Sequence, residues 1–173
     1  MSVVLLSGHL DEARLCRVQE EIWGGLDNSC VLVIDSLGGD LQPTVDFVEE
    51  MLDSVGVGRT VFSSMRIYNA ESAAALISLA LPAAVKEMRE GAILGVHRGS
   101  VILDTSDLDL VNGSVANHAT LALLRRHEAT LKEALVKRDL SSDPKLMAEL
   151  YGSNWLHLSA EECLRRGIVT RLF

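Results

Sequence analysis

The pattern that most restricts the fold is an unbroken apolar run followed by paired glycines and an amphipathic stretch. Residues 31–34 (VLVI) show no polar alternation, as expected of a strand covered on both faces in a parallel sheet. Gly38 and Gly39 follow this run, and residues 45–52 then repeat apolar side chains at helical spacing. A strand, a tight turn and a helix in this order predict the repeating unit of a layered α/β fold.

The same order of strand and helix recurs along the chain. Residues 3–7 predict a strand and residues 12–22 an amphipathic helix, while residues 60–62 predict the next strand. Residues 73–85 form the longest apolar stretch, and we predict a buried helix there because the stretch is shorter than the roughly 20 residues that span a bilayer. Residues 92–97 predict a further strand. Repeated ββα or βα units of this kind predict a mostly parallel sheet with helices packed on it.

The C-terminal part carries the clearest helix signals. Residues 115–137 predict a long helix with leucines on one side and charged residues on the other. Ser159 and Glu162 have the spacing of a capping box. Gly167 suits the position just after a helix, and residues 168–169 predict the start of a closing strand.

Composition excludes several classes of function. The net charge of −8 disfavours nucleic acid and anionic membranes as partners. The three cysteines form neither a CxxC pair nor a zinc-ligand spacing, so we expect no metal site and a reducing, cytoplasmic location. The N-terminus lacks the features of a signal peptide, and no GxxxxGK or GxGxxG motif supports nucleotide binding. Without a linker or repeat, residues 1–173 are expected to form a single domain.

Three positions carry candidate chemistry. Ser72 precedes a predicted buried helix, where its hydroxyl suits either a nucleophile near free backbone N–H groups or an ordinary N-cap. His97 ends an apolar strand, where catalytic groups collect in α/β sheets, although a histidine without a task also fits there. Gly38 and Gly39 suit a tight turn or one half of an oxyanion hole. The other histidines have less in their favour; His127, for example, falls on the charged helix.

Taken in order, these signals resemble the Clp protease proteolytic subunit family almost from end to end. The spacing between Ser72 and His97 agrees with that family. The similar segments are residues 3–11 (VVLLSGHLD), 34–39 (IDSLGG), 69–75 (NAESAAA), 93–97 (ILGVH), 158–162 (LSAEE) and 167–169 (GIV).

The resemblance implies a fold and a set of roles. The fold is the layered α/β type of the Clp protease and crotonase superfamily, with repeated ββα units and a projecting handle helix at 115–137 in a handle region of about 98–143. Ser72 is implied as the nucleophile and His97 as the general base, with the backbone N–H groups of Gly39 and Ala73 as the oxyanion hole. No cofactor is implied. Peptides or unfolded proteins would be the substrate, and the subunits would assemble as a homo-oligomeric ring.

The resemblance fails at the third catalytic residue. An ungapped count back from the Ser159 segment puts Tyr151 where the family carries its catalytic Asp. Asn154 could orient the imidazole instead, as Asn does in Cys-His-Asn enzymes, and Tyr151 could accept a hydrogen bond from the ring. Asp143 and Glu149 are weaker alternatives. A triad without its Asp can lose turnover by a factor on the order of 10⁴.

Two further departures concern partners. The resemblance begins at Val3, so the family's N-terminal axial segment has no counterpart in the matched region. Val31 and Val33 replace the aromatic residues with which the family docks its ATPase. The sequence therefore predicts against docking to an ATP-dependent unfoldase.

Three functions follow as hypotheses. The first is a serine peptidase that forms an acyl-enzyme on Ser72 with His97 as base. The second is a catalytically silent structural or regulatory subunit, because the Asp is missing. The third and weakest is a crotonase-type acyl-CoA enzyme, since that superfamily shares the layered fold and the paired N–H groups but has no use for the spacing of Ser72 and His97.

Overall fold

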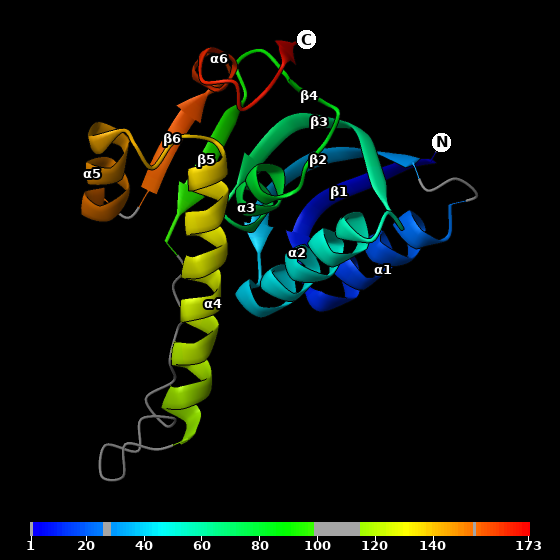
Figure 1. The fold of residues 1–173 in the computed structure, drawn as a ribbon, viewed down its shortest axis with the longest axis horizontal. Helices are drawn as coiled ribbons and strands as arrows, with labels where there is room; N and C mark the ends of the chain where they lie inside the picture. The colour runs from blue at the N-terminus through cyan, green and yellow to red at the C-terminus, as the bar shows by residue number, and fades with distance from the viewer. Residues whose placement is uncertain (1, 26–28, 99–114, 154) are drawn as a thin grey trace.

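A computed structural model describes residues 2–25, 29–98, 115–153 and 155–173. Strands and helices mostly alternate along the chain (Figure 1). The elements are β1 (Ser2–Leu10), α1 (Glu12–Trp23), β2 (Ser29–Gly39), α2 (Leu41–Gly56), β3 (Val61–Glu71), α3 (Ala73–Ala80), β4 (Val85–Met88), β5 (Ile93–His97), α4 (Val115–Lys137), α5 (Pro144–Ser153), β6 (Trp155–Ser159), α6 (Ala160–Arg165) and β7 (Arg171–Leu172).

The sheet is mostly parallel, which confirms the predicted α/β class. Its main path runs β1-β2-β3-β4-β7, and every pairing along it is parallel. The long strand β3 pairs first with β4 and then, at Ala70 and Glu71, with β5. Among the described strands, β6 alone is antiparallel to its neighbour, which is β5. The end of β3 therefore lies directly beside β5, which brings Ser72 and His97 to the same edge.

One face of the sheet is covered by helices and the other is open. Helices α1, α2 and α3 lie on the same side of β1–β3 (Figure 1), and α3 is buried along its whole length. Burial alternates along β2, and on the neighbouring strand Val3 and Leu5 are 69% and 47% exposed. The prediction that residues 31–34 are covered on both faces is therefore wrong for this chain, because no described helix lies over the second face of these strands.

Several predicted boundaries differ from the structure. The predicted helix at 73–85 ends at Ala80, because Pro82 disfavours helical geometry before it and has no N–H to donate. The chain then forms β4, a strand that the sequence did not predict because it contains charged residues. The predicted strand at 60–62 is much longer in the structure, since β3 continues to Glu71, directly before Ser72. The closing strand begins at Arg171 rather than at Ile168.

The ends of α6 confirm the N-cap serine of the predicted capping box and the glycine after the helix, while the Glu162 side chain binds Arg166. Ser159 Oγ accepts a hydrogen bond from Glu162 N (3.2 Å). At the other end Gly167 has φ +69°, and its N–H donates to Leu164 O (3.0 Å) while Ile168 N donates to Cys163 O (2.9 Å). These two bonds are the Schellman pattern, which stops the helix where the sequence predicted.

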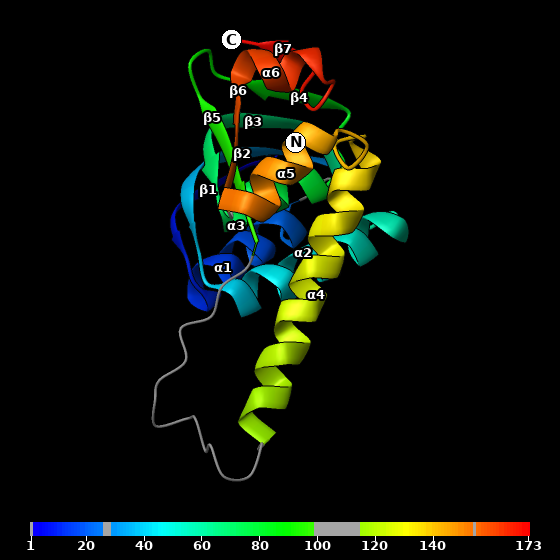
Figure 2. The same ribbon diagram turned by 90° about the vertical axis from the view of Figure 1, so that its left-hand side faces the viewer.

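The long helix α4 has the predicted bounds and extends well beyond the other helices (Figures 1 and 2). Its C-terminal half is anchored, since Leu131 and Leu135 are buried and Arg126 binds Asp46 and Glu49 of α2 (2.7 and 2.6 Å). The preceding part of the predicted handle region, 99–114, lies outside the described residues. Among the described helices, none combines the length and apolar character needed to cross a membrane.

Strand β4 buries a lysine whose ionisation should couple to stability. Lys86 is 3% exposed, and its Nζ donates to Ser78 O near the C-terminal end of α3 (2.5 Å). Burial, with a smaller contribution from the charge of Arg138, lowers the pKa of Lys86 from 10.5 to about 6. The folded chain therefore carries a neutral amine at neutral pH, where the unfolded chain carries an ammonium group.

We expect the free energy of unfolding to rise with pH between about pH 7 and 8.5. In this range the unfolded state binds one more proton at Lys86, so the slope is up to about 1.4 kcal/mol per pH unit. Urea denaturation at both ends of the range measures it. Lys86→Met should remove the slope, and an equal slope in this variant would contradict the assignment to Lys86.

Candidate active site

Ser72 lies at a sharp turn between β3 and α3. Its φ of 53° and ψ of −120° are unusual for a residue other than glycine. It occupies the N-cap position, yet its Oγ makes no cap hydrogen bond in the described part of the chain. The turn is held by Ser72 N, which donates to Gly95 O on β5 (2.7 Å). The strained backbone thus directs the hydroxyl away from the helix that an ordinary N-cap serine would serve.

Gly38 and Gly39 allow β2 to end directly against this turn. A Cβ atom on Gly38 would lie 2.6 Å from Ser72 Cβ, and one on Gly39 would lie 2.4 Å from Leu10 N. The N–H of Gly38 already donates to Ser36 Oγ (3.0 Å). Gly39 lines the cavity beside Ser72. Of the two glycines, it is therefore the better candidate to donate its backbone N–H in that cavity.

His97 faces Ser72 across this edge of the sheet. Ser72 Oγ and His97 Nε2 are 2.6 Å apart, and His97 Nδ1 lies 2.6 Å from Arg98 O. A carbonyl oxygen can only accept, so Nδ1 carries the proton of the neutral ring. Nε2 is then the acceptor for the Ser72 hydroxyl. This arrangement has the geometry of a serine nucleophile with its base.

Among the described residues, the acceptor at Nδ1 is the peptide carbonyl of Arg98. Tyr151 lies instead under the Arg98 guanidinium, whose Cζ is 4.9 Å from the centre of the tyrosine ring. Asn154 lies outside the described residues. Asp143 binds Arg166 (2.8 Å), and this hydrogen bond contributes most to holding its pKa below the usual range.

Trp155 is a neighbour of the imidazole that the sequence did not single out. It pairs with His97 across β5 and β6, and the two ring centres are 4.4 Å apart with a tilt of 35°. His157 stacks on the ring of Trp155, with the two ring centres 5.3 Å apart. The alternation of Trp155 and His157 with buried leucines predicts a strand with both rings on one face, and this signal could have been found.

A second histidine, His127 on α4, also faces the site. A cavity of about 320 Å³ is lined by Ser72, His97, Gly39, Ala73 and His127, together with Asp40, Leu41, Thr44 and Leu76. His127 is 6% exposed, and burial lowers its pKa to about 4, with the charge of His97 as a smaller cause. His127 lies four residues before Leu131 and therefore on the apolar side of α4. The charged residues around it obscured this position in the sequence.

The chemistry that this arrangement offers is nucleophilic. Ser72, His97, Gly39 and Ala73 line one small cavity, in which Ser72 Oγ lies 2.6 Å from His97 Nε2. Among the described residues, no three His, Cys, Asp or Glu side chains are grouped so that they could hold a metal ion.

Comparison with known proteins finds a similar fold. The catalytic domain of the ClpP protease from Plasmodium falciparum superimposes with a TM-score of 0.67, over 99% of this chain and 84% of that one. The two sequences are 11% identical, so the similarity concerns the fold. No family model matches the sequence, and no curated protein matches it.

Proposed function

We propose that this protein is a serine peptidase. The proposal depends above all on the contact between Ser72 Oγ and His97 Nε2 (2.6 Å) at a strained turn. Gly39 and Ala73 line the same cavity, as two backbone N–H donors of an oxyanion hole should. The similar fold of a protease catalytic domain supports the same reaction class.

The reaction begins when His97 Nε2 removes the proton of Ser72 and Oγ attacks the scissile carbonyl. The N–H groups of Gly39 and Ala73 stabilise the oxyanion, and the imidazolium then protonates the leaving amine. Water hydrolyses the acyl-enzyme with His97 again as base. Throughout these steps the Nδ1–H of His97 donates to Arg98 O, which holds the ring in the tautomer that the first step needs.

Extended peptides or unfolded segments are the proposed substrates, and further copies of this chain are the proposed partners. The open face of the sheet supports assembly, because Val3 and Leu5 expose apolar surface beside the half-buried Val31 and Val33. Burying apolar surface is the general reason for stable association of such faces.

A catalytically silent subunit is the second candidate. It is favoured by the neutral acceptor at His97 Nδ1, since a peptide carbonyl stabilises an imidazolium less than a carboxylate does. Such a subunit would assemble with copies of itself or with active relatives and would hydrolyse nothing.

Labelling with a fluorophosphonate probe tests the proposal. We expect the wild-type protein to gain the mass of one probe, and peptide mapping should place it on Ser72. Ser72→Ala should remain unlabelled, whereas Ser63→Ala, which alters a serine earlier on β3, should be labelled like the wild type. A wild-type protein that remains unlabelled at every pH and assembly state would favour the silent subunit.

A further inference from the structure

The acceptor for His97 Nδ1 belongs to the backbone of the next residue, so the orientation of the imidazole depends on how Arg98 is held. His97 is the last residue of β5 with a partner on β6, and Arg98 lies just beyond this ladder. Among the described residues, no strand pairing fixes the carbonyl of Arg98 as pairing fixes those within β5. Some other contact has to determine its direction if the 2.6 Å hydrogen bond is to persist.

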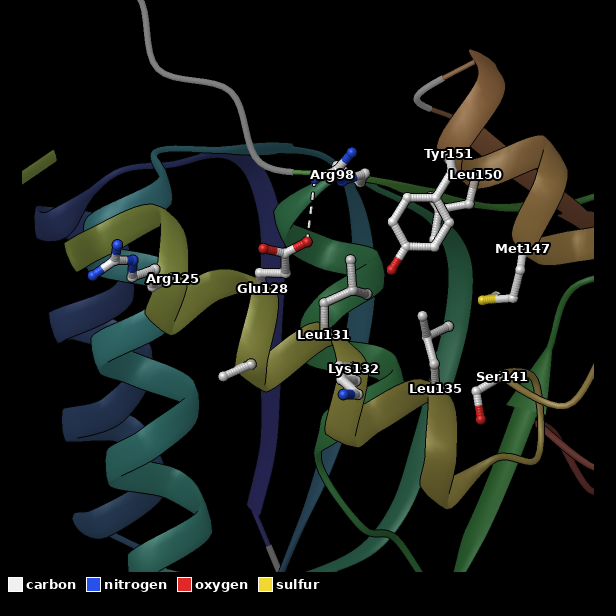
Figure 3. Close-up of a pocket in the computed structure, with 11 residues that line it drawn as sticks. Arg98, Arg125, Glu128, Leu131, Lys132, Leu135, Ser141, Met147, Leu150 and Tyr151 are labelled. Carbon is white, nitrogen blue, oxygen red and sulfur yellow. Dashed lines mark hydrogen bonds and ion pairs between the residues drawn. The ribbon is translucent and has the colours of Figure 1, made fainter. Parts of the chain in front are cut away.

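The side chain of Arg98 supplies two such contacts, one from each neighbouring helix. Its guanidinium lies 4.9 Å from the centre of the Tyr151 ring on α5, and its Nη2 donates to Glu128 Oε1 on α4 (3.2 Å). Figure 3 shows Arg98 between these two side chains at the rim of a cavity of about 540 Å³. Leu131, Leu135 and Leu150 also line this cavity.

A simpler interpretation is that Arg98 makes an ordinary surface ion pair. Its side chain and that of Glu128 are 43% and 54% exposed, and such pairs contribute little to stability. The position of the guanidinium over the Tyr151 ring distinguishes the present arrangement, because this cation–π contact adds a second attraction, from a second helix, to that of the ion pair. Two contacts from two helices restrict the side chain far more than one exposed pair would.

The geometry points to Arg98 as a positioning residue that Tyr151 and Glu128 hold in place, so that its carbonyl keeps His97 in the Nδ1–H tautomer. Tyr151, which the sequence placed near the third catalytic position, thus acts on the imidazole through Arg98 and does not touch it. The catalytic consequence of this inference rests on the proposed peptidase function. The tautomer itself does not, and it can be observed in an inactive protein.

Nitrogen NMR of the full chain labelled with ¹⁵N-histidine tests the inference directly. The His97 signals are assigned by their loss in His97→Gln. In the wild type we expect a neutral ring protonated at Nδ1, with a protected Nδ1–H resonance. Tyr151→Leu and Arg98→Ala should lose that resonance and populate the other tautomer, and the rate of fluorophosphonate labelling should fall about tenfold.

Two variants serve as matched controls. Tyr151→Phe keeps the ring face and should keep both the resonance and the labelling rate. Lys132→Ala changes another residue that lines the same cavity and should do the same. Retention of the Nδ1–H resonance in Tyr151→Leu and Arg98→Ala would overturn the inference. If the wild type is not labelled at all, the proposed function fails, and the NMR result still decides whether Arg98 positions the ring.

Discussion

Replacing His97 with alanine is expected to lower the rate of peptide hydrolysis by about a hundredfold, and not by the millionfold seen in complete triads. Removing the Ser or His of a complete triad costs roughly 2 × 10⁶ in turnover, whereas removing its Asp alone costs roughly 3 × 10⁴. In the described residues a carbonyl stands where a triad has its carboxylate. Most of the loss is therefore already present in the wild type, and about a factor of 10² is left for His97 to supply.

Hydrolysis of an unstructured fluorogenic peptide by wild type, His97→Ala and Ser72→Ala measures this factor. His9→Ala serves as the control, because this exposed histidine binds Asp40 (3.1 Å) and does not contact Ser72. A loss near 10⁶ would mean that a carboxylate completes the triad in the assembled protein. Equal rates in His97→Ala and the wild type would exclude His97 as the base.

The fold could be predicted because its signals are local. Gly167 and the Ser159 cap define α6 within a few residues, and the apolar run at 31–34 marks a strand wherever it packs. Coverage of the sheet could not be predicted in the same way, since an apolar strand looks identical whether a helix or another molecule lies over its second face. Strand β4 was missed because Lys86 and Glu87, both buried, look like surface residues in the sequence.

The candidate site also has parts that local sequence signals predict and parts that only the folded structure determines. Ser72, His97 and the two glycines could be proposed from their order along the chain, and the structure brings them together. The Arg98 carbonyl could not be proposed as the acceptor, because every residue carries a carbonyl and only the folded backbone determines which one faces the imidazole. The strand that carries Trp155 could have been found from its alternation, but the position of Trp155 beside His97 depends on the pairing of β5 with β6, which lie far apart in the sequence.

Gly38→Ala is expected to cause a large loss of stability, because the added methyl group meets the turn that carries Ser72. The new Cβ would lie 2.6 Å from Ser72 Cβ and 2.9 Å from Glu71 O, and the φ of +104° already disfavours alanine. Backbone strain and overpacking together should lower the free energy of unfolding by about 2 to 6 kcal/mol. Since the displaced group is the Ser72 turn itself, labelling of Ser72 should fall as well.

Gly58→Ala separates backbone strain from overpacking, because Gly58 has φ +72° but nothing lies within 4 Å of a Cβ added there. Here only the strain acts, and we expect a loss of about 1 to 2 kcal/mol with unchanged labelling. Urea denaturation of both variants, and labelling where both are folded, make the comparison. Equal losses would show that backbone conformation alone requires glycine at position 38. A larger loss in Gly38→Ala with slower labelling would show that the Ser72 turn packs against residue 38 too closely to admit a methyl group.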